Sequence, residues 1–447
     1  MNFYNLELKN LTKKQLFLVF SYSACWLSIS TDFNDMYPLS YIEYKIFNNL
    51  SFSHMINFLR QSLNILIFPI LLYLFIKKIN HIKIKKDLIF FSFFFYFLLQ
   101  IPGLIFYQNS LMNFVYIMSA INILIILQLS NFYFNKDNYI IFAFISFLML
   151  LLITILNYNT FINFIKFDSR SLYTFFTSSE TFLGKDSPRS TGSSRTFLLI
   201  FLISLMIFLN FLKRKVVLKN TLFITIATII LLFQSRTTIV LLIVFIILNY
   251  RYENPVKIKD KLKYLFIYFA CPVIFLYFIL VVKNISIVKE NLNLIFDNSG
   301  SITTFNILKE DFQRPIDPET YSSGRYEDWN NLYHKIKKSP IIGYGSQGDR
   351  FSIDQTASNG ALYALSSSGI LGFSFYCILT IYSLILIFQK FIFLNKKNTK
   401  GYICSIIIFI IILRSILESS YSVFGVDFII FSSFIFYLNK LNQKNEY

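Results

Sequence analysis

Residues 221–250 read TLFITIATIILLFQSRTTIVLLIVFIILNY, an apolar run broken only by the polar stretch 234–237. Each half is short for a helix that must cross about 30 Å of hydrocarbon. We therefore predict two helices joined by a tight turn. Ser235 and Arg236 in this turn would lie at or just below the outer surface of the membrane that the chain spans. The alternative is one long tilted helix that buries the arginine, which is costly in lipid. It would reduce the spans to eleven and move the lysines at 390–400 to the wrong side, so the hairpin is favoured.

The rest of the chain has the same apolar character. Of its 447 residues, 55% are hydrophobic and 15% are charged, and the mean hydropathy is +0.55, far from the values of soluble globular proteins. Backbone groups in lipid must bond to one another, so the apolar runs are expected to be helices. The sequence predicts an all-α polytopic membrane protein with about twelve transmembrane helices and a large late periplasmic loop that contains short helices. The spans are expected at residues 15–31, 56–76, 88–107, 111–130, 139–157, 196–212, 221–234, 237–250, 264–282, 360–388, 401–417 and 424–438.

The positions of lysine and arginine predict the orientation. With the N-terminus inside, 24 of the 42 basic residues fall in inner segments, whereas the short outer connections carry only Lys45 and Arg236. This asymmetry indicates that both termini are cytoplasmic. It also explains most of the +18 net charge, so nucleic acid is not an expected partner. We treat 1–447 as a single integral membrane domain with long periplasmic loops at 158–195 and 283–359.

Arginine is distributed differently from lysine. The inner segments hold 22 lysines but only two of the 11 arginines. Lysine is a point charge that serves topology, whereas the planar fork of arginine binds phosphate or carboxylate in a bidentate way. The pattern favours an outward-facing cavity for a phosphate-bearing or acidic substrate over loop solvation alone. The arginines outside the inner segments are Arg60, Arg170, Arg189, Arg195, Arg236, Arg314, Arg325, Arg350 and Arg414.

Some of these arginines have informative neighbours. Arg189 and Arg195 flank the hydroxyl-rich stretch 190–194, directly before the sixth span, where a helix N-terminus favours an anion. Helix capping alone would also explain the serines there. Arg414 lies one turn before Glu418, a spacing that allows a structural ion pair within one helix.

The second long loop ends in a segment with regular features. Between residues 325 and 338, apolar residues recur at three- and four-residue steps, which predicts a short amphipathic helix that stops at Pro340. Its apolar positions are Trp329, Leu332, Tyr333 and Ile336. The glycines at 343, 345 and 348 then allow a tight loop, either to bring backbone close to a ligand or only to make turns.

Titratable side chains give fewer indications. The three histidines are scattered, and the four cysteines lie in apolar runs without ligand-like spacing, so we expect neither a metal nor another cofactor. Four acids of the second loop are candidate bases, and their spacing alone does not choose among them. They are Glu327, Asp328, Asp349 and Asp354.

Several local features of the chain occur together in one known family. They are Ser323, Gly324, Arg325 and Trp329, then Pro340, Gly343, Tyr344 and Gly345, then Asn359, with residues 369–372 opening a helix. Together with the Ser235 and Arg236 turn and about twelve spans, they resemble the O-antigen polymerase and O-antigen ligase family of bacterial envelope glycosyltransferases. The resemblance implies, as substrate, oligosaccharide repeats on undecaprenyl pyrophosphate at the periplasmic face. It also implies contact with membrane lipid and admits a chain-length regulator protein as a partner.

The reaction that this resemblance implies is glycosyl transfer without a nucleotide sugar. Arg325 and Arg236, helped by Arg189 or Arg195, would bind the pyrophosphate leaving group and stabilise its developing charge. A sugar hydroxyl of a second lipid-linked repeat attacks the anomeric carbon. Asp354, the acid closest in sequence to the turn at Ser358 and Asn359, would take the proton of this hydroxyl. On this account arginine supplies the positive charge and no metal is required.

One residue departs from the family pattern and bears on the choice among rival functions. Family members with ligase activity usually have a histidine before the asparagine that here is Asn359, and this chain has Ser358. The departure favours a polymerase over a ligase that moves polysaccharide to lipid A core. A flippase for the same lipid-linked sugar is a further alternative, but its charges should be reachable from both sides, and here the arginines and long loops lie on one side.

Overall fold

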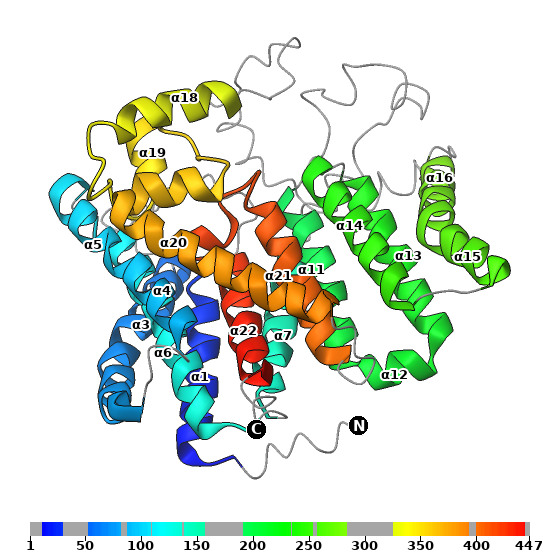
Figure 1. The fold of residues 1–447 in the computed structure, drawn as a ribbon, viewed down its shortest axis with the longest axis horizontal. Coiled ribbons are helices and arrows are strands. Elements are labelled where there is room, and N and C mark those ends of the chain that lie inside the picture. The colour runs from blue at the N-terminus through cyan, green and yellow to red at the C-terminus, as the bar shows by residue number, and fades with distance from the viewer. Residues whose placement is uncertain are drawn as a thin grey trace. The chain divides into compact units, whose positions relative to one another are not determined.

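The computed structural model describes residues 11–29, 52–81, 87–108, 110–135, 138–156, 191–233, 235–253, 257–283, 325–392 and 399–442 (Figure 1). Every regular element in these ranges is a helix, which confirms the all-α prediction. The helices up to residue 214 are α1 (Lys13–Leu27), α3 (Phe52–Ile76), η3 (Ile79–His81), α4 (Leu88–Leu98), α5 (Gln100–Gly103), η4 (Leu104–Gln108), α6 (Leu111–Tyr133), α7 (Ile140–Leu156), α11 (Thr191–Ile207) and α12 (Leu209–Arg214). Those that follow are α13 (Val216–Leu232), α14 (Arg236–Glu253), α15 (Ile258–Leu265), η5 (Phe266–Ala270), α16 (Cys271–Lys283), α18 (Arg325–Ile336), α19 (Gly348–Ile353), α20 (Gly360–Ile392), α21 (Thr399–Arg414), η8 (Ser420–Ser422) and α22 (Val426–Asn442).

These helices support a polytopic membrane protein. Each predicted span coincides with one helix or with a continuous series of helices. Within the described ranges, four segments are long and apolar enough to cross a membrane by length and composition: Leu88–Gln108, Asn113–Tyr133, Ile258–Ile279 and Gly360–Phe391. Shorter apolar helices accompany them. The late loop also contains the short helices α18 and α19, as predicted.

The run at 221–250 forms a hairpin, as predicted, and not one long helix. α13 ends at Leu232 and α14 begins at Arg236. The two helices are antiparallel, because the rings of Phe223 and Phe245 stack with their centroids 6.2 Å apart. Further from the turn, Lys219 Nζ lies 2.6 Å from Glu253 Oε1.

The chain packs as two compact units. The first unit contains Met1–Leu151, Leu202–Leu212 and Glu327–Tyr447, and the second contains Leu152–Phe201 and Lys213–Tyr326. The hairpin of α13 and α14 therefore belongs to the second unit, whereas α18 from Glu327, α19 and α20 belong to the first.

Aromatic rings hold the first unit together. Phe93 of α4 makes edge-to-face contacts with Phe428 and Phe431 of α22, at centroid distances of 5.4 and 5.8 Å. Tyr421 stacks on Phe431 at 4.2 Å and on Tyr376 of α20 at 5.3 Å. Such ring pairs contribute beyond the area that they bury. They fix α4, α20 and α22 around the turn that contains η8.

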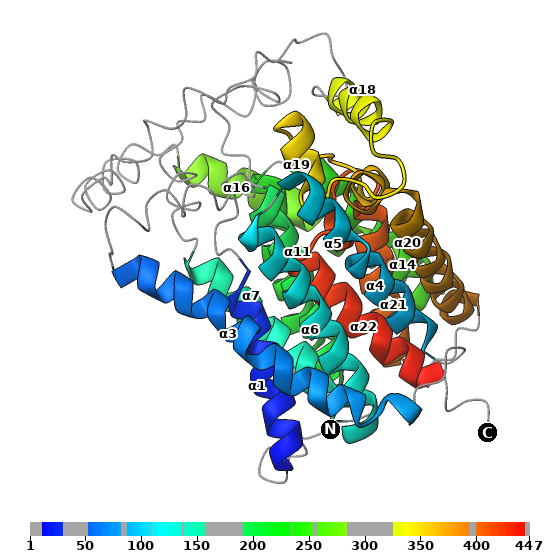
Figure 2. The ribbon, with the colours of Figure 1, turned by 90° about the vertical axis from the view of Figure 1, so that its left-hand side faces the viewer.

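The start of α1 and the end of α22 lie at the same end of the first unit. Gln15 Nε2 donates to the Tyr133 carbonyl oxygen at 2.6 Å. Lys440 Nζ donates to the Phe134 carbonyl oxygen at 2.5 Å, and Figure 2 shows α6 and α22 side by side. Both terminal helices therefore meet the end of α6. That this end is cytoplasmic stays a prediction.

Candidate active site

A kink in α20 organises the segment that carries most of the family-like residues. Gly369 has φ 61° and ψ −168° inside the helix. The Ile370 N–H, which a continuous helix would direct to the Ser366 carbonyl, donates instead to the Pro340 carbonyl oxygen at 2.8 Å. The freed carbonyls of Ser366 and Ser367 accept from the N–H groups of residues 344 and 345, at 2.7 and 2.9 Å. The loop at 340–345 thus satisfies the backbone groups that the kink releases.

The glycines of this loop permit close backbone contact. A Cβ at Gly345 would lie 2.5 Å from the Leu104 nitrogen, and one at Gly103 would lie 2.4 Å from the Gly345 nitrogen. A Cβ at Gly343 would lie 2.6 Å from the Gly369 nitrogen. Gly343 and Gly345 also have positive φ angles of 71° and 86°. The structure therefore favours the structural interpretation of these glycines over close approach to a ligand.

The short π-helix η4 completes this packing. Gln108 Nε2 donates to the Tyr344 carbonyl oxygen at 2.6 Å, and the Tyr107 and Tyr344 rings lie 5.1 Å apart. One-turn π-helices recur near functional sites. Here the π-helix connects α5 to the loop that supports the kink.

The amphipathic helix predicted in this segment is confirmed as α18. Its buried face packs against the start of α20 and the segment that precedes it. Leu332 is fully buried and Ile336 is nearly so, in a cluster with Ala357 and Tyr363. Trp329 Nε1 donates to the Ala357 carbonyl oxygen at 2.7 Å. Tyr333, which was expected among the apolar positions, is half exposed on another side of the helix.

Asp349 binds the N–H of Ala357, the residue whose carbonyl accepts from Trp329. Its Oδ2 accepts from the Ala357 N–H at 2.7 Å, and only 2% of the residue is exposed. Its Oδ1 has no hydrogen-bond partner among the described residues. Burial raises the pKa of this carboxyl above its ordinary value, although the Ala357 hydrogen bond and the charge of Arg350 act in the opposite direction. Trp329 and Asp349 therefore hold residue 357 from both sides, just before the turn that opens α20.

Asn359 forms the N-cap of α20. Its Oδ1 accepts from the N–H groups of Ala361 and Leu362 at 2.9 and 3.0 Å, the usual capping arrangement. Its Nδ2 donates to the Ile416 carbonyl oxygen at 2.9 Å, which ties α20 to the end of α21. Ser358 has a positive φ of 45°, and its hydroxyl lies 3.2 Å from that of Thr356.

The predicted base, Asp354, is exposed and follows α19 directly. It has a left-handed backbone with φ 54°, and its N–H donates to the Arg350 carbonyl oxygen at 2.9 Å. Its carboxylate makes no ion pair or hydrogen bond with the residues that the structure describes. Asp354 is thus accessible to a substrate, whereas the buried Asp349 is not. The catalytic role of Asp354 stays a prediction.

Two of the predicted phosphate-binding arginines lie on neighbouring elements of the second unit. Arg236 is the first residue of α14 and is exposed. Helix α11 begins at Thr191 and not at residue 196 as expected, so Arg195 belongs to its first turns and not to the preceding loop. The ring of Phe197 on α11 stacks on that of Phe233 at the hairpin turn, with centroids 6.5 Å apart. This contact brings the first turns of α11 beside the turn that carries Arg236.

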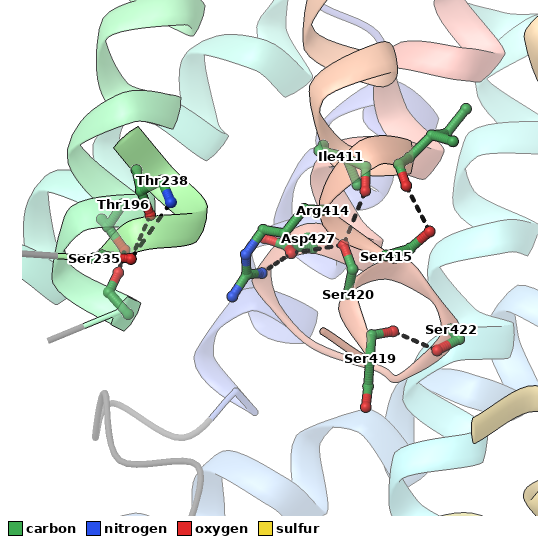
Figure 3. Close-up of polar contacts among 12 residues, drawn as sticks. Thr196, Ser235, Thr238, Ile411, Arg414, Ser415, Ser419, Ser420, Ser422 and Asp427 are labelled. Atoms are coloured by element: carbon green, nitrogen blue, oxygen red, sulfur yellow. Dashed lines mark hydrogen bonds and ion pairs between the residues drawn. The ribbon is translucent and has the colours of Figure 1, made fainter. Parts of the chain in front are cut away.

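The hairpin turn is held by its own hydroxyl groups. The Ser235 hydroxyl lies 2.9 Å from that of Thr238 and accepts from the Thr238 N–H at 3.5 Å (Figure 3). Arg325 is the first residue of α18, and its relation to Arg195 and Arg236 stays a prediction. Arg189 lies outside the described residues.

The partner of Arg414 differs from the expected one. Arg414 forms a buried ion pair with Asp427 of α22, whereas Glu418 was the predicted partner. The Ser420 hydroxyl lies 2.8 Å from Asp427 Oδ2 and 3.2 Å from the Ile411 carbonyl oxygen (Figure 3). Because α21 ends at Arg414, residue 418 is not one helical turn further along the same helix. The pair joins two helices and belongs to the packing of the first unit.

Comparison with protein families matches residues 221–377 to the family described as O-antigen ligase. The matched range begins in α13 and includes the hairpin turn, α18, α19 and the kink of α20. It confirms the resemblance drawn from the sequence. Comparison with curated proteins found no match, and comparison with solved structures found none either.

Proposed function

We propose that this chain, with its O-antigen ligase family domain at residues 221–377, is an O-antigen polymerase of the bacterial inner membrane. It would join oligosaccharide repeats carried on undecaprenyl pyrophosphate at the periplasmic face, with both termini in the cytoplasm. The observation that carries the proposal is that the matched range contains both arginine-bearing helix starts, Arg236 on α14 and Arg325 on α18.

The proposed reaction is an exchange at the anomeric carbon of one repeat. A hydroxyl oxygen of a second repeat forms the new glycosidic bond, and the bond from that carbon to the pyrophosphate oxygen breaks. Lipid pyrophosphate leaves with the electron pair, and Asp354 takes the hydroxyl proton. Arg325 and Arg236, with Arg195 or Arg189, stabilise the negative charge that develops on the leaving group, as fixed cationic donors do in other active sites.

The absence of a histidine before Asn359 favours the polymerase over the ligase. Ser358 has no group that titrates near neutral pH. Its hydroxyl is engaged with Thr356, and its neighbour caps α20. The turn in this chain therefore has a structural role that needs no base. A chain-length regulator is the proposed protein partner.

Deletion of the gene, followed by gel analysis of the surface polysaccharide, tests the proposal. We expect single repeats attached to core and no ladder. Polymer that is retained on its lipid carrier, with no attached sugar, would instead identify a ligase. Repeats that remain accessible only from the cytoplasm would identify a flippase.

Arg325→Lys tests the site with the charge kept and the fork removed. We expect polymer of more than one repeat to fall at least about tenfold, because loss of one positioned donor of a charged leaving group typically has such an effect. Arg251→Lys, at an exposed residue near the other end of α14, is the matched control and should leave the ladder unchanged.

A further inference from the structure

The kink at Gly369 divides α20 into a short first part and a longer second part. The helix has 33 residues, which corresponds to about 50 Å. This length exceeds the hydrocarbon thickness of about 30 Å. The part after Gly369 measures about 35 Å and matches a single crossing. Figure 1 shows α20 changing direction near its start. The kink at Gly369 makes Ile370 the first residue of the part that is long enough to cross.

An exposed apolar edge lies at this level. We call it the isoleucine edge: Ile341, Ile342, Ile370 and Leu371. Their exposed fractions are 62%, 36%, 57% and 53%. The two halves are adjacent, because Ile370 N–H bonds to the Pro340 carbonyl and a Cβ on Gly369 would meet the Ile341 carbonyl at 2.1 Å. The edge is therefore placed where a side chain would enter the hydrocarbon from the headgroup region.

Three lysines precede the isoleucine edge closely in the sequence. Lys335 in the last turn of α18 and the two residues directly after the helix, Lys337 and Lys338, are exposed. Lys337 Nζ lies 4.5 Å from the centre of the Tyr333 ring. None of them forms a salt bridge with an acid in the described ranges. Helix α18 cannot rotate to hide Lys335, since Leu332 and Ile336 of the same helix are buried in the core. The result is a cluster of exposed positive charge that directly precedes the apolar edge in the chain.

We infer that Lys335, Lys337 and Lys338, with the isoleucine edge, form a binding surface for anionic phospholipid headgroups of the adjacent leaflet. Lysine stems reach along apolar surface while the ammonium groups stay in the headgroup region. Clustered lysines next to a membrane attract anionic lipids additively. Lysine supplies a point charge, which suits a headgroup surface, and not the bidentate recognition of arginine.

This surface gives α18 a defined height above the bilayer. Arg325 begins the same helix. If the proposed function holds, anchoring α18 keeps Arg325 at the level of a lipid-linked pyrophosphate. The lipid surface itself is independent of that function.

The test uses the full chain in nanodiscs made with phosphatidylcholine alone or with added phosphatidylglycerol, and no sugar substrate. Amide hydrogen exchange is followed in the segment 325–342. We expect phosphatidylglycerol to slow exchange there by about threefold or more, and added salt to remove the effect. The variant Lys335→Gln, Lys337→Gln, Lys338→Gln should show equal exchange in both lipids.

The matched control is Lys259→Gln, Lys261→Gln, Lys263→Gln on α15, which removes the same charge from another exposed helix. It should keep the slowing at 325–342. Equal exchange of the wild type in both lipids, or slowing that survives the α18 substitutions or high salt, would overturn the inference. Protection of 325–342 by inorganic phosphate alone would also overturn it, because it would identify a small-anion site. Protection only by added undecaprenyl pyrophosphate would likewise overturn it, because it would assign the lysines to the carrier lipid. Because no polymerisation is measured, failure of the proposed function leaves this result unaffected.

Discussion

At the scale of single residues, two buried carboxylates serve the architecture in different ways. Asp427 is neutralised by Arg414 inside the first unit. Asp349 has no such partner and instead accepts the Ala357 N–H, with one oxygen left without a hydrogen bond in the described part of the chain. Buried charges are costly unless they are paired, so the two sites should respond in opposite ways to removal of charge.

For Asp349, we expect Asn to be tolerated and Ala to be damaging. Burial raises the carboxyl pKa in the folded state, so the folded protein binds the proton more tightly than the unfolded chain. This contribution to stability is present at acid pH and is lost as pH rises from the ordinary aspartate pKa through the raised one. Asp349→Asn keeps an acceptor for the Ala357 N–H and does not titrate. As pH increases through this range, its thermal stability should therefore rise relative to that of the wild type.

Melting temperatures from pH 4 to 7 check this expectation, with Asp349→Ala as the comparison. The alanine variant leaves the Ala357 N–H without its acceptor and should lose about 1–3 kcal/mol. A gap between Asn and wild type that does not change with pH would contradict the buried-carboxyl explanation.

For Arg414, removal of one partner should cost more than removal of both. Arg414→Met leaves Asp427 buried without the charge of Arg414, with an expected loss of about 3–5 kcal/mol. The double variant with Asp427→Leu should recover much of that loss, because both charges are then absent. Thermal unfolding of the purified chain measures both, and the exposed Arg251→Met is the control. Additive losses in the double variant would be inconsistent with the observed pair.

At the scale of elements, the kink in α20 depends on backbone segments that touch directly. α5 and η4, the loop at 340–345 and the kink contact one another through glycines. Each missing Cβ allows a hydrogen bond or a close approach that a side chain would block. The family-like glycines therefore define an assembly of three segments and not an isolated loop.

Gly345→Ala should disrupt this assembly. The added Cβ would meet backbone atoms of Leu104 at 2.5 and 2.7 Å, and the φ of 86° is unfavourable for alanine. We expect a loss of about 2 kcal/mol or more in the free energy of unfolding. Gly425→Ala is the matched control, since its Cβ would meet nothing within 4 Å. Equal melting temperatures of the two variants would show that the close contact does not limit stability.

At the scale of the whole molecule, described contacts bring the two terminal helices to the same end of the first unit. The start of α1 and the end of α22 meet the same end of α6. An even number of crossings between them is consistent with this arrangement. The predicted interior position of both ends follows from the lysine asymmetry.

Reporter fusions test this topology. Alkaline phosphatase joined to the C-terminus should be inactive, and green fluorescent protein in the same place should fluoresce, because that end is predicted to be cytoplasmic. A phosphatase inserted at residue 354, in the predicted periplasmic loop, should be active. An active C-terminal phosphatase would reverse the orientation.

The sequence by itself determined the helices, the hairpin at 221–250, the amphipathic α18 and the family to which the 221–377 segment is similar. These features depend on apolar length, periodicity and short motifs, which are local properties of the chain. For the same reason the start of α11 was misplaced by five residues, since a hydroxyl-rich segment can either precede a helix or begin it.

Only the tertiary structure decided which side chains meet. Arg414 pairs with Asp427, 13 residues away, and not with Glu418, because α21 ends and the chain turns back before α22. Asp349 reaches Ala357 across a left-handed residue at Asp354, and Gly345 reaches Leu104 from a segment far along the chain. These contacts depend on where helices end and cross, and packing of distant segments sets those points, so no local pattern encodes them.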